Sequence, residues 1–173
     1  SNADTCLGLH YSPSTFVDLS SSNSNKKAVY IATGTRNSTT FIKYEDKKIY
    51  AAGTNDSNQL GHDNTSQGFS QIEYFEQNNI DIVKIVSGLS HTLFLDSSGY
   101  LYGCGSNDEN GLGITKNSNN IFKYDDLLVP IIDCATTTNH SILLTSERKV
   151  YTCGRNIYGE CGQDNNSLVS TFT

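Results

Sequence analysis

The chain repeats one stretch of nine residues at intervals of about fifty: Gly53-Thr-Asn55-Asp-Ser-Asn58-Gln-Leu60-Gly61, Gly105-Ser-Asn107-Asp-Glu-Asn110-Gly-Leu112-Gly113 and Gly154-Arg-Asn156-Ile-Tyr-Gly159-Glu-Cys161-Gly162. A shorter match, Cys6-Leu7-Gly8, lies near the start. Periods of this size are typical of stacked supersecondary units. The sequence therefore predicts three turns of a repeat. We place them at approximately 9–61, 62–113 and 114–162, with 163–173 starting a further repeat; they lie in a segment 4–173 that follows what looks like an expression-tag remnant at 1–3.

Short β-branched and aromatic segments recur within each repeat and are typical of strands. We predict strands at 28–32, 40–44 and 48–52, at 82–87, 91–95 and 100–104, and at 131–135, 141–145 and 149–153, with weaker fourth segments at 71–75 and 121–124. Asp96-Ser-Ser-Gly99 predicts a tight hairpin turn. Four short antiparallel strands make a propeller blade, so we expect an all-β fold with three blades in a partial or open β-propeller.

The repeated loop is predicted to have a structural role. An Asn side chain two residues after a Gly can close an Asx-turn by bonding the backbone two residues on, and Asn or Gly three positions later tolerates the left-handed αL conformation. A phosphate cradle would need a following helix, and none is apparent. The loop residues assigned to this role are Gly53, Asn55, Gly61, Gly105, Asn107, Gly113, Gly154, Asn156 and Gly162.

Two histidines, His91 and His140, occupy the same slot just inside the second strand of their repeats, where the first repeat has Asn37. A catalytic histidine is not expected in duplicate at equivalent positions. We expect both to be structural and to bond backbone groups between strands, a role that Asn can partly fill.

These repeats resemble those of the regulator of chromosome condensation family. The pattern is Gly-x-x-His, a strand, a turn with Gly, an aromatic-containing strand, and Gly-x-Asn-x-x-Gly-Gln-Leu-Gly, which Gly88-Leu-Ser-His91 and the run from Gly99 to Gly113 match closely. This chain departs from the pattern at Thr137, Asn37 and Cys161. The chain has no Trp and no Gly-Gly pair, which argues against Trp-Asp and kelch repeats. The resemblance implies seven-bladed propellers, protein–protein recognition and, for the founding activity, nucleotide exchange on the small GTPase Ran.

Composition narrows the function classes. The net charge is −6, and residues 51–173 carry most of the acidic excess, which disfavours direct nucleic-acid binding and can steer a basic protein partner. Five cysteines without a close pair fit small buried residues in a reducing compartment, so we expect a cytoplasmic or nuclear protein. The sequence offers no membrane span and no metal, cofactor or catalytic set.

One rim of the propeller is the predicted partner site. If strands alternate in direction, the Gly-x-x-His loop and the Asn loop of each blade share a rim, opposite the hairpins. Its candidate residues are Arg36, Asp56, Ser90, Asp108, Glu109, Asn139 and Tyr158. We weigh a protein-interaction module, part of an exchange factor for a Ran-like GTPase, and a small-ligand receptor or enzyme.

Three blades do not close a ring, and an open array exposes edge strands and apolar blade faces. The sequence therefore leaves two alternatives. Either the chain is a segment of a longer array, or copies associate as a homodimer that covers those faces.

Overall fold

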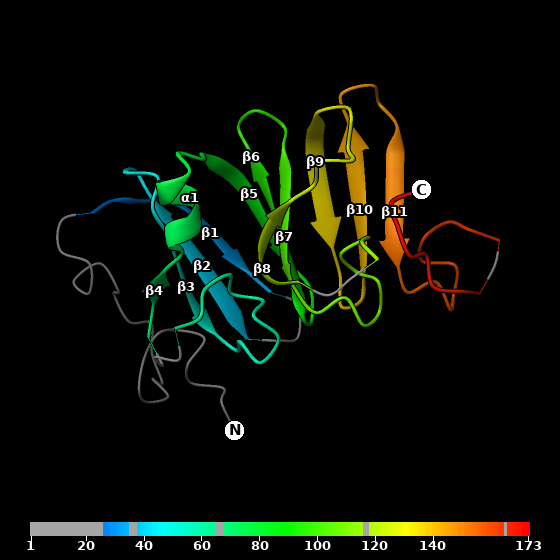
Figure 1. The fold of residues 1–173 in the computed structure, drawn as a ribbon, viewed down its shortest axis with the longest axis horizontal. Coiled ribbons are helices and arrows are strands. Elements are labelled where there is room, and N and C mark those ends of the chain that lie inside the picture. Colours follow the sequence, from blue (N-terminus) through cyan, green and yellow to red (C-terminus); the bar gives the residue numbers. More distant parts are fainter. Residues whose placement is uncertain (1–25, 35–37, 65–67, 116–117, 165) are drawn as a thin grey trace.

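The computed structural model describes residues 26–34, 38–64, 68–115, 118–164 and 166–173. Within these residues the chain forms three antiparallel sheets that stand side by side in chain order (Figure 1). Each sheet is one blade, and together they form an open, partial propeller. The all-β fold class is confirmed.

Consecutive strands pair throughout each blade. Blade 1 contains β1 (Ala28–Thr33), β2 (Thr39–Tyr44), β3 (Ile49–Gly53) and β4 (Ser70–Gln71). Blade 2 contains β5 (Ile82–Ser87), β6 (His91–Asp96), β7 (Leu101–Gly105) and β8 (Ser118–Lys123). Blade 3 contains β9 (Ile131–Thr136), β10 (His140–Thr145) and β11 (Val150–Gly154). All the strong segments predicted as strands are found, with each boundary within one residue.

The outer edge of blade 3 is formed by the last residues of the chain. Val169 forms an antiparallel bridge with Gly154, and Thr173 exchanges backbone hydrogen bonds with Thr152 at 3.0 and 3.1 Å. These residues therefore occupy the place that β8 takes in blade 2.

The segment 71–75 is not a strand as predicted. The chain leaves β4 after Gln71 and forms the short helix α1 (Glu73–Gln77). Ile72 and Phe75 are both 1% exposed. Two buried residues three positions apart fit the period of a helix, whereas in a strand they would point to opposite faces. The sequence therefore predicts correctly that this segment is apolar, but the spacing of its buried residues is that of a helix and not of a strand.

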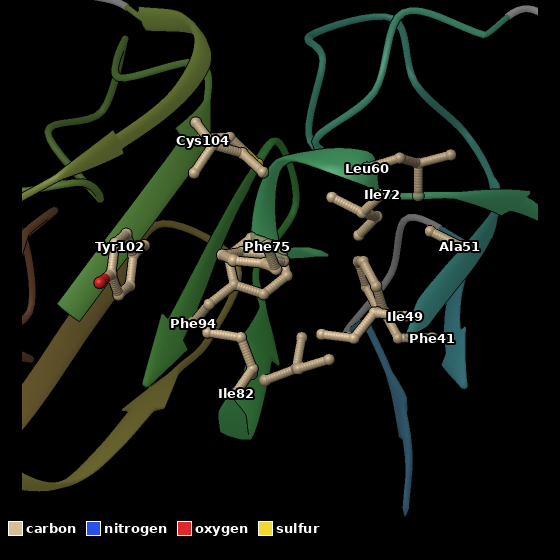
Figure 2. Close-up of a cluster of buried hydrophobic side chains, with 12 residues drawn as sticks. Phe41, Ile49, Ala51, Leu60, Ile72, Phe75, Ile82, Phe94, Tyr102 and Cys104 are labelled. Atoms are coloured by element: carbon tan, nitrogen blue, oxygen red, sulfur yellow. The ribbon is translucent and has the colours of Figure 1, made fainter. Parts of the chain in front are cut away.

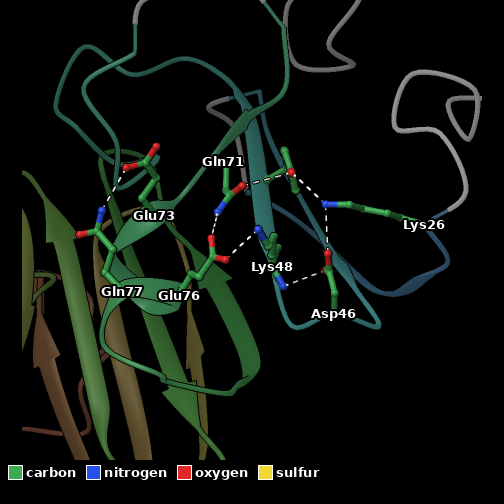
Figure 3. A network of polar contacts seen from close by, with 8 residues as sticks. Lys26, Asp46, Lys48, Gln71, Glu73, Glu76 and Gln77 are labelled. Carbon is green, nitrogen blue, oxygen red and sulfur yellow. Dashed lines mark hydrogen bonds and ion pairs between the residues drawn. The ribbon is translucent and has the colours of Figure 1, made fainter.

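Polar contacts hold α1 against the outer part of blade 1 (Figure 3). Glu76 pairs with Lys48 at 2.7 Å and also accepts a hydrogen bond from Gln71. The hydrogen bond from Lys48, followed by that from Gln71, lowers the pKa of the Glu76 carboxyl. Because these groups are exposed, each pair adds little stability. The buried side chain of Phe75 is therefore the main anchor of the helix.

Apolar contacts between blades form the core, and the middle blade is buried on both faces. In β6 all six residues are buried, with Phe94 facing blade 1 and Leu93 and Leu95 facing blade 3. Phe94 packs against Phe41 of blade 1 with ring centroids 6.0 Å apart, and against Phe75 at 4.9 Å (Figure 2). The core between blades is thus formed by side chains, and single backbone hydrogen bonds such as that from the Leu89 N–H to the Thr138 carbonyl cross between blades 2 and 3.

The equivalent strand of blade 3 is covered on one face only. In β10, Ser141, Leu143 and Thr145 are buried toward blade 2, whereas Ile142 is 40% exposed on the other face. Val150 on β11 is 57% exposed. The sequences of β6 and β10 are equally apolar, so the difference comes from their neighbours and not from their residues.

The closing glycines of the repeated loop lie against the next blade. Gly61, Gly113 and Gly162 have φ angles of +76°, +65° and +69°. A Cβ on Gly113 would lie 2.7 Å from the ring of Phe172 and 2.9 Å from Sγ of Cys153, both in blade 3, and a Cβ on Gly61 would meet Ile121 of blade 2 at 3.0 Å. A Cβ on Gly162 would meet nothing within 4 Å.

This difference predicts unequal effects of the same substitution. Gly113→Ala should lower the free energy of unfolding by the left-handed strain, about 1–2 kcal/mol, plus about 1–3 kcal/mol for the clash with Phe172 and Cys153. Gly162→Ala should cost the strain alone. Urea denaturation of the two variants measures the difference, and equal losses would show that contact with the next blade does not matter.

Candidate functional site

The repeated Asn lies at the centre of its loop and binds both ends of it. Asn55 Oδ1 accepts a hydrogen bond from the Leu60 N–H at 2.9 Å, and Asn55 Nδ2 donates to the His62 carbonyl at 2.8 Å. In the same way, Asn107 accepts from Leu112 and donates to Ile114, and Asn156 accepts from Cys161 and donates to Gln163. For Asn55 the predicted Asx-turn is wrong in its reach, because its side-chain bonds span five and seven residues rather than two, and bonds of the same two spans recur at Asn107 and Asn156.

Two successive turns wrap the backbone around that side chain. In blade 2, Asn110 N–H donates to the Asn107 carbonyl and Gly113 N–H donates to the Asn110 carbonyl, each at 2.9 Å. Asn58, Asn110 and Gly159 have φ angles of +59°, +59° and +82°, as predicted for residues that tolerate αL. The side-chain amide of the Asn is thus enclosed by its own loop.

In blades 2 and 3 the Asn loop lies beside the loop that precedes the second strand, as the sequence predicts. Ser106 N–H donates to the Ser90 carbonyl at 2.8 Å, and Arg155 N–H donates to the Asn139 carbonyl at 2.9 Å. These bonds place the Asn loop beside the loop that precedes the second strand, on one rim. Gly105 has a φ angle of +106°, and a Cβ there would meet the Ser90 carbonyl oxygen at 2.2 Å.

His91 joins blade 2 to blade 3. Its Nε2 lies 2.7 Å from Thr136 Oγ1 and 3.1 Å from Ser141 Oγ, and the ring is 3% exposed. The ring bonds side-chain hydroxyls of the next blade, whereas the sequence predicts bonds to backbone groups between strands. Burial, and to a lesser degree the charge of His140, lowers the pKa of His91 to about 4.

The residue equivalent to these histidines in blade 1 is Thr39 and not Asn37. Thr39 pairs with Gly53 in the sheet, as His91 pairs with Gly105 and His140 with Gly154. Asn37 itself lies outside the described residues. His91 lies three positions after Gly88, whereas Thr39 lies five positions after Gly34. A count of three from Gly34 therefore selects Asn37 instead of Thr39.

Four of the predicted rim residues line one hollow between blades 2 and 3. The hollow has a volume of about 230 Å³. Its walls include Ser90, Asn139, Asp108 and Glu109, together with His91 and Gly111. Asp108 and Glu109 are exposed, and the Asp108 N–H donates to Ser106 Oγ at 3.1 Å. The joint between blades therefore creates a concave surface bordered by two carboxylates.

The remaining rim residues lie outside that hollow. Asp56 is exposed on the Asn loop of blade 1, and Arg36 lies outside the described residues. Tyr158 is 83% exposed on the Asn loop of blade 3, where the Arg155 guanidinium lies 5.8 Å from the centre of its ring. Ile157 beside it is 45% exposed. The rim thus changes from acidic in blade 2 to aromatic and apolar in blade 3.

Sequence reasoning missed the hydroxyl residue at the start of each second strand. Thr92 Oγ1 donates to the Gln59 carbonyl of blade 1 at 2.7 Å, and Ser141 Oγ donates to the Gly111 carbonyl of blade 2 at 2.6 Å. The sequence does contain a sign of this role, because Thr or Ser occupies the equivalent position in each repeat. Hydroxyl residues are so frequent in this chain that the recurrence does not stand out.

The cysteines behave as core residues. Cys104, Cys134, Cys153 and Cys161 are buried as free thiols. Burial is the largest cause in both cases and raises the pKa of Cys134 to about 12 and the pKa of Cys104 further.

Within the part of the chain that the structure describes, no group of three or more His, Cys, Asp or Glu side chains could hold a metal ion. Nor does any helix there have the length and apolar character to span a membrane.

The three blades and their repeated loop define this chain as part of a repeat-built propeller. Comparison with models of known families identifies the family of the repeat. Residues 46–95 match one model of the Regulator of chromosome condensation (RCC1) repeat, and residues 82–111 and 131–163 match a second model of that repeat. Together these matches cover more than half of the chain, which belongs to this repeat family.

Similar proteins are much longer than this chain. The Regulator of chromosome condensation of Homo sapiens is 28% identical over 120 residues, which cover 67% of this chain and 28% of the relative. An RCC1 repeat-containing protein of Dictyostelium discoideum is 33% identical over 119 residues, covering 63% and 24%. The structure of Prp20p from Saccharomyces cerevisiae superimposes with a TM-score of 0.75 at 21% identity, over 84% of this chain and 37% of that one. This chain spans less than half the length of each.

The Asn loop predicts a graded loss of stability. Asn107→Ala removes one accepted and one donated hydrogen bond and should lower the free energy of unfolding by about 2 kcal/mol. Asn107→Asp keeps the acceptor for Leu112 and should lose less. Chemical denaturation compares the two variants, and wild-type stability in Asn107→Ala would contradict the assignment.

The depressed pKa of His91 predicts acid sensitivity. Between pH about 4 and 6.5 the unfolded chain binds a proton at this position and the folded chain does not, so stability should fall as pH falls through that window, by up to about 3 kcal/mol. His91→Gln should be less stable at pH 7 and show a shallower pH dependence. Urea denaturation measured at each pH gives the slope, and a wild-type pH dependence in His91→Gln would contradict the assignment.

Proposed function

We propose that this chain is a protein-interaction module that receives a basic protein surface on the rim carrying the Asn loops. The observation that supports this most directly is the hollow between blades 2 and 3, where Asp108 and Glu109 border a concave surface. Concave surfaces with a few oriented polar groups are typical binding sites. Both carboxylates are exposed to a partner without any opening of the blades.

Electrostatics favour a basic partner at this rim. The acidic excess of the chain lies in residues 51–173, which include blades 2 and 3. Such a field attracts cationic surfaces over distances of about 10 Å at moderate salt and raises the rate of association. The acidic hollow then supplies specificity for Lys or Arg side chains.

The Asn loop of blade 3 supplies the apolar part of the proposed surface. Tyr158 and Ile157 are exposed, and Arg155 lies over the Tyr158 ring. Aromatic residues and Arg carry a large share of the binding energy at protein interfaces. A partner segment that combines basic and apolar residues would match both halves of the rim.

A similar protein of known structure suggests two kinds of partner. The structure of Prp20p was described together with its binding to Gsp1p and histones. Histones are strongly basic and fit the acidic rim, which would place the activity in the nucleus. By analogy we propose histones as the first partner to test and a Ran-like small GTPase as the second.

Nucleotide exchange on a Ran-like GTPase is the second candidate function. It is favoured by the acidic rim and by the family relationship to the Regulator of chromosome condensation. Exchange needs no covalent chemistry, since a factor that binds the nucleotide-free GTPase more tightly than the loaded one expels the nucleotide. Asp108 and Glu109 would contact the GTPase.

Charge reversal tests the rim. Asp108→Lys combined with Glu109→Lys should weaken binding of purified core histones by about tenfold or more, because two attractive charges become repulsive. Fluorescence anisotropy at several salt concentrations measures the affinity. The matched control is Asp125→Lys combined with Asp126→Lys, which reverses two exposed carboxylates. They lie on the opposite rim, in the loop that leads to Pro130, and the Pro130 carbonyl accepts a hydrogen bond from the Ser146 N–H in the hairpin of blade 3. Equal losses in both pairs would reduce the effect to net charge and reject the rim.

Release of labelled GDP from Ran separates the two candidates. An exchange function predicts faster release with the chain than without it, and a loss of that acceleration in the rim variant. Histone binding without faster release would favour the interaction module.

A further inference from the structure

One dipeptide in the Asn loop of blade 2 has no counterpart in the other two blades. Residues 110 and 111 are the single Asn-Gly pair of the chain, whereas the same two loop positions hold Asn58-Gln59 in blade 1 and Gly159-Glu160 in blade 3. Glycine has no side chain to shield its backbone nitrogen from the residue before it. The side-chain amide of Asn110 can therefore approach the Gly111 nitrogen more easily than the amide of Asn58 can approach the nitrogen of Gln59.

The folded loop fixes the backbone of Asn110. Its N–H donates to the Asn107 carbonyl and its carbonyl accepts from the Gly113 N–H, each at 2.9 Å, at a φ angle of +59°. Among the described residues, by contrast, the Asn110 side chain and the Gly111 N–H have no hydrogen-bond partner. Asn110 is half-buried, and its neighbours Glu109 and Gly111 line the hollow between blades 2 and 3. The amide is thus free to turn toward the next backbone nitrogen, and water can reach the pair.

The packing of His91 in the joint accounts for glycine at position 111. A Cβ on Gly111 would lie 2.6 Å from Cε1 and 2.9 Å from Nδ1 of His91. This ring is buried and is held in place by two hydroxyls of blade 3. In blade 1 the residue equivalent to His91 is Thr39, which is smaller, and the loop has Gln59 in place of the glycine. The Asn-Gly pair is therefore a consequence of how blades 2 and 3 meet.

We propose that Asn110 and Gly111 form a site of spontaneous covalent modification, at which the asparagine becomes aspartate or isoaspartate. The Gly111 nitrogen attacks the side-chain amide carbon of Asn110 and forms a new C–N bond. The amide nitrogen leaves as ammonia with the proton that the Gly111 nitrogen gives up, and a succinimide ring remains. Water then adds to either carbonyl of the ring and breaks one C–N bond. Water is the one co-reactant, and no group is oxidised or reduced.

Both products alter the surroundings of the joint. Each places a further carboxylate beside Asp108 and Glu109. The isoaspartate also adds one methylene group to the main chain directly before Gly111, whose carbonyl accepts from Ser141 Oγ at 2.6 Å and from Cys153 Sγ at 3.5 Å. A longer main chain displaces this carbonyl, so the modification weakens the contact between blades 2 and 3. The inference is independent of the proposed partner.

The first test compares two asparagines within the wild-type chain. Asn58 is the matched control, because it has the same φ angle of +59° and the same pair of turn bonds, at 3.1 Å each, but precedes Gln59. The folded chain is stored at mildly alkaline pH, and peptide mapping with mass spectrometry follows the replacement of each amide by a carboxyl. We expect Asn110 to react about tenfold faster than Asn58, which corresponds to an activation barrier lower by about 1.4 kcal/mol.

Two substitutions change the site without changing the turn. Asn110→Gly removes the reacting amide and is compatible with the positive φ angle, since blade 3 has Gly159 at this position with a φ angle of +82°. On storage the wild-type chain should lose denaturation midpoint as its isoaspartate fraction rises, and Asn110→Gly should not. Gln59→Gly creates a second Asn-Gly pair, so Asn58 should then react at a rate close to that of Asn110.

Three results would overturn the proposal. The first is equal rates at Asn110 and Asn58 in the folded wild-type chain, a comparison that needs no variant. The second is modification at Asn110 in urea and none in the folded chain, because the loop would then protect the pair. The third is a loss of midpoint on storage that is as large in Asn110→Gly as in the wild type, because the change at the joint would then have another origin.

Discussion

The carbonyl of the Asn loop is the group on which the rest of the structure depends, because it links one blade to the next. A blade of four short strands has two apolar faces and too few residues to bury either alone, so stability comes from the interfaces between blades. The carbonyls of Gln59 and Gly111 each lie at the end of such an interface and accept a hydroxyl and a thiol. Because hydrogen bonds are directional, these bonds constrain the position of one blade on the next in addition to the apolar packing.

The Asn loop presents that carbonyl only when its backbone is held in one shape. Asn107 binds the loop from within, Asn110 and Gly113 supply the positive φ angles, and Gly113 leaves room for Phe172. One short motif thus encodes the turn, the joint and the close approach of the next blade. This accounts for the recurrence of its first Gly, its Asn and its closing Gly in all three copies.

The sequence predicted the strands well because their signal is local and occurs three times. The β-branched and apolar residues of segments such as 82–87 and 91–95, which recur in each repeat, placed the boundaries of the three strong strands of each blade within one residue. The exceptions occur where a tertiary contact overrides the local pattern. Phe75 is buried in the interface with blade 2, which favours one helical turn over a strand. Thr39 replaces Asn37 because the sheet register, and not the count from the preceding glycine, sets equivalence.

The candidate site was only partly predictable for the same reason. Ser90, Asp108, Glu109 and Asn139 were grouped on one rim from strand direction alone, and the structure brings these four to a single hollow. That they line the joint between two blades could not be read from the sequence, since it depends on which loop of blade 3 lies beside blade 2. Leu89 N–H donates to the Thr138 carbonyl at 2.9 Å across this gap, which fixes both walls.

The position of the hollow links the proposed binding site to the joint between blades 2 and 3. His91 lies in the wall of the hollow and also contacts Thr136 and Ser141 within the interface. A change that separates blades 2 and 3 therefore alters the shape of the rim site, even when no rim residue is substituted. The two carboxylates that border this hollow are the two residues after the Asn of the blade 2 loop, where the other two copies have Asp-Ser and Ile-Tyr. The loop thus separates two roles by position: Asn and Gly maintain the joint, and the residues between them, which differ among the three copies, are those we propose to contact the partner.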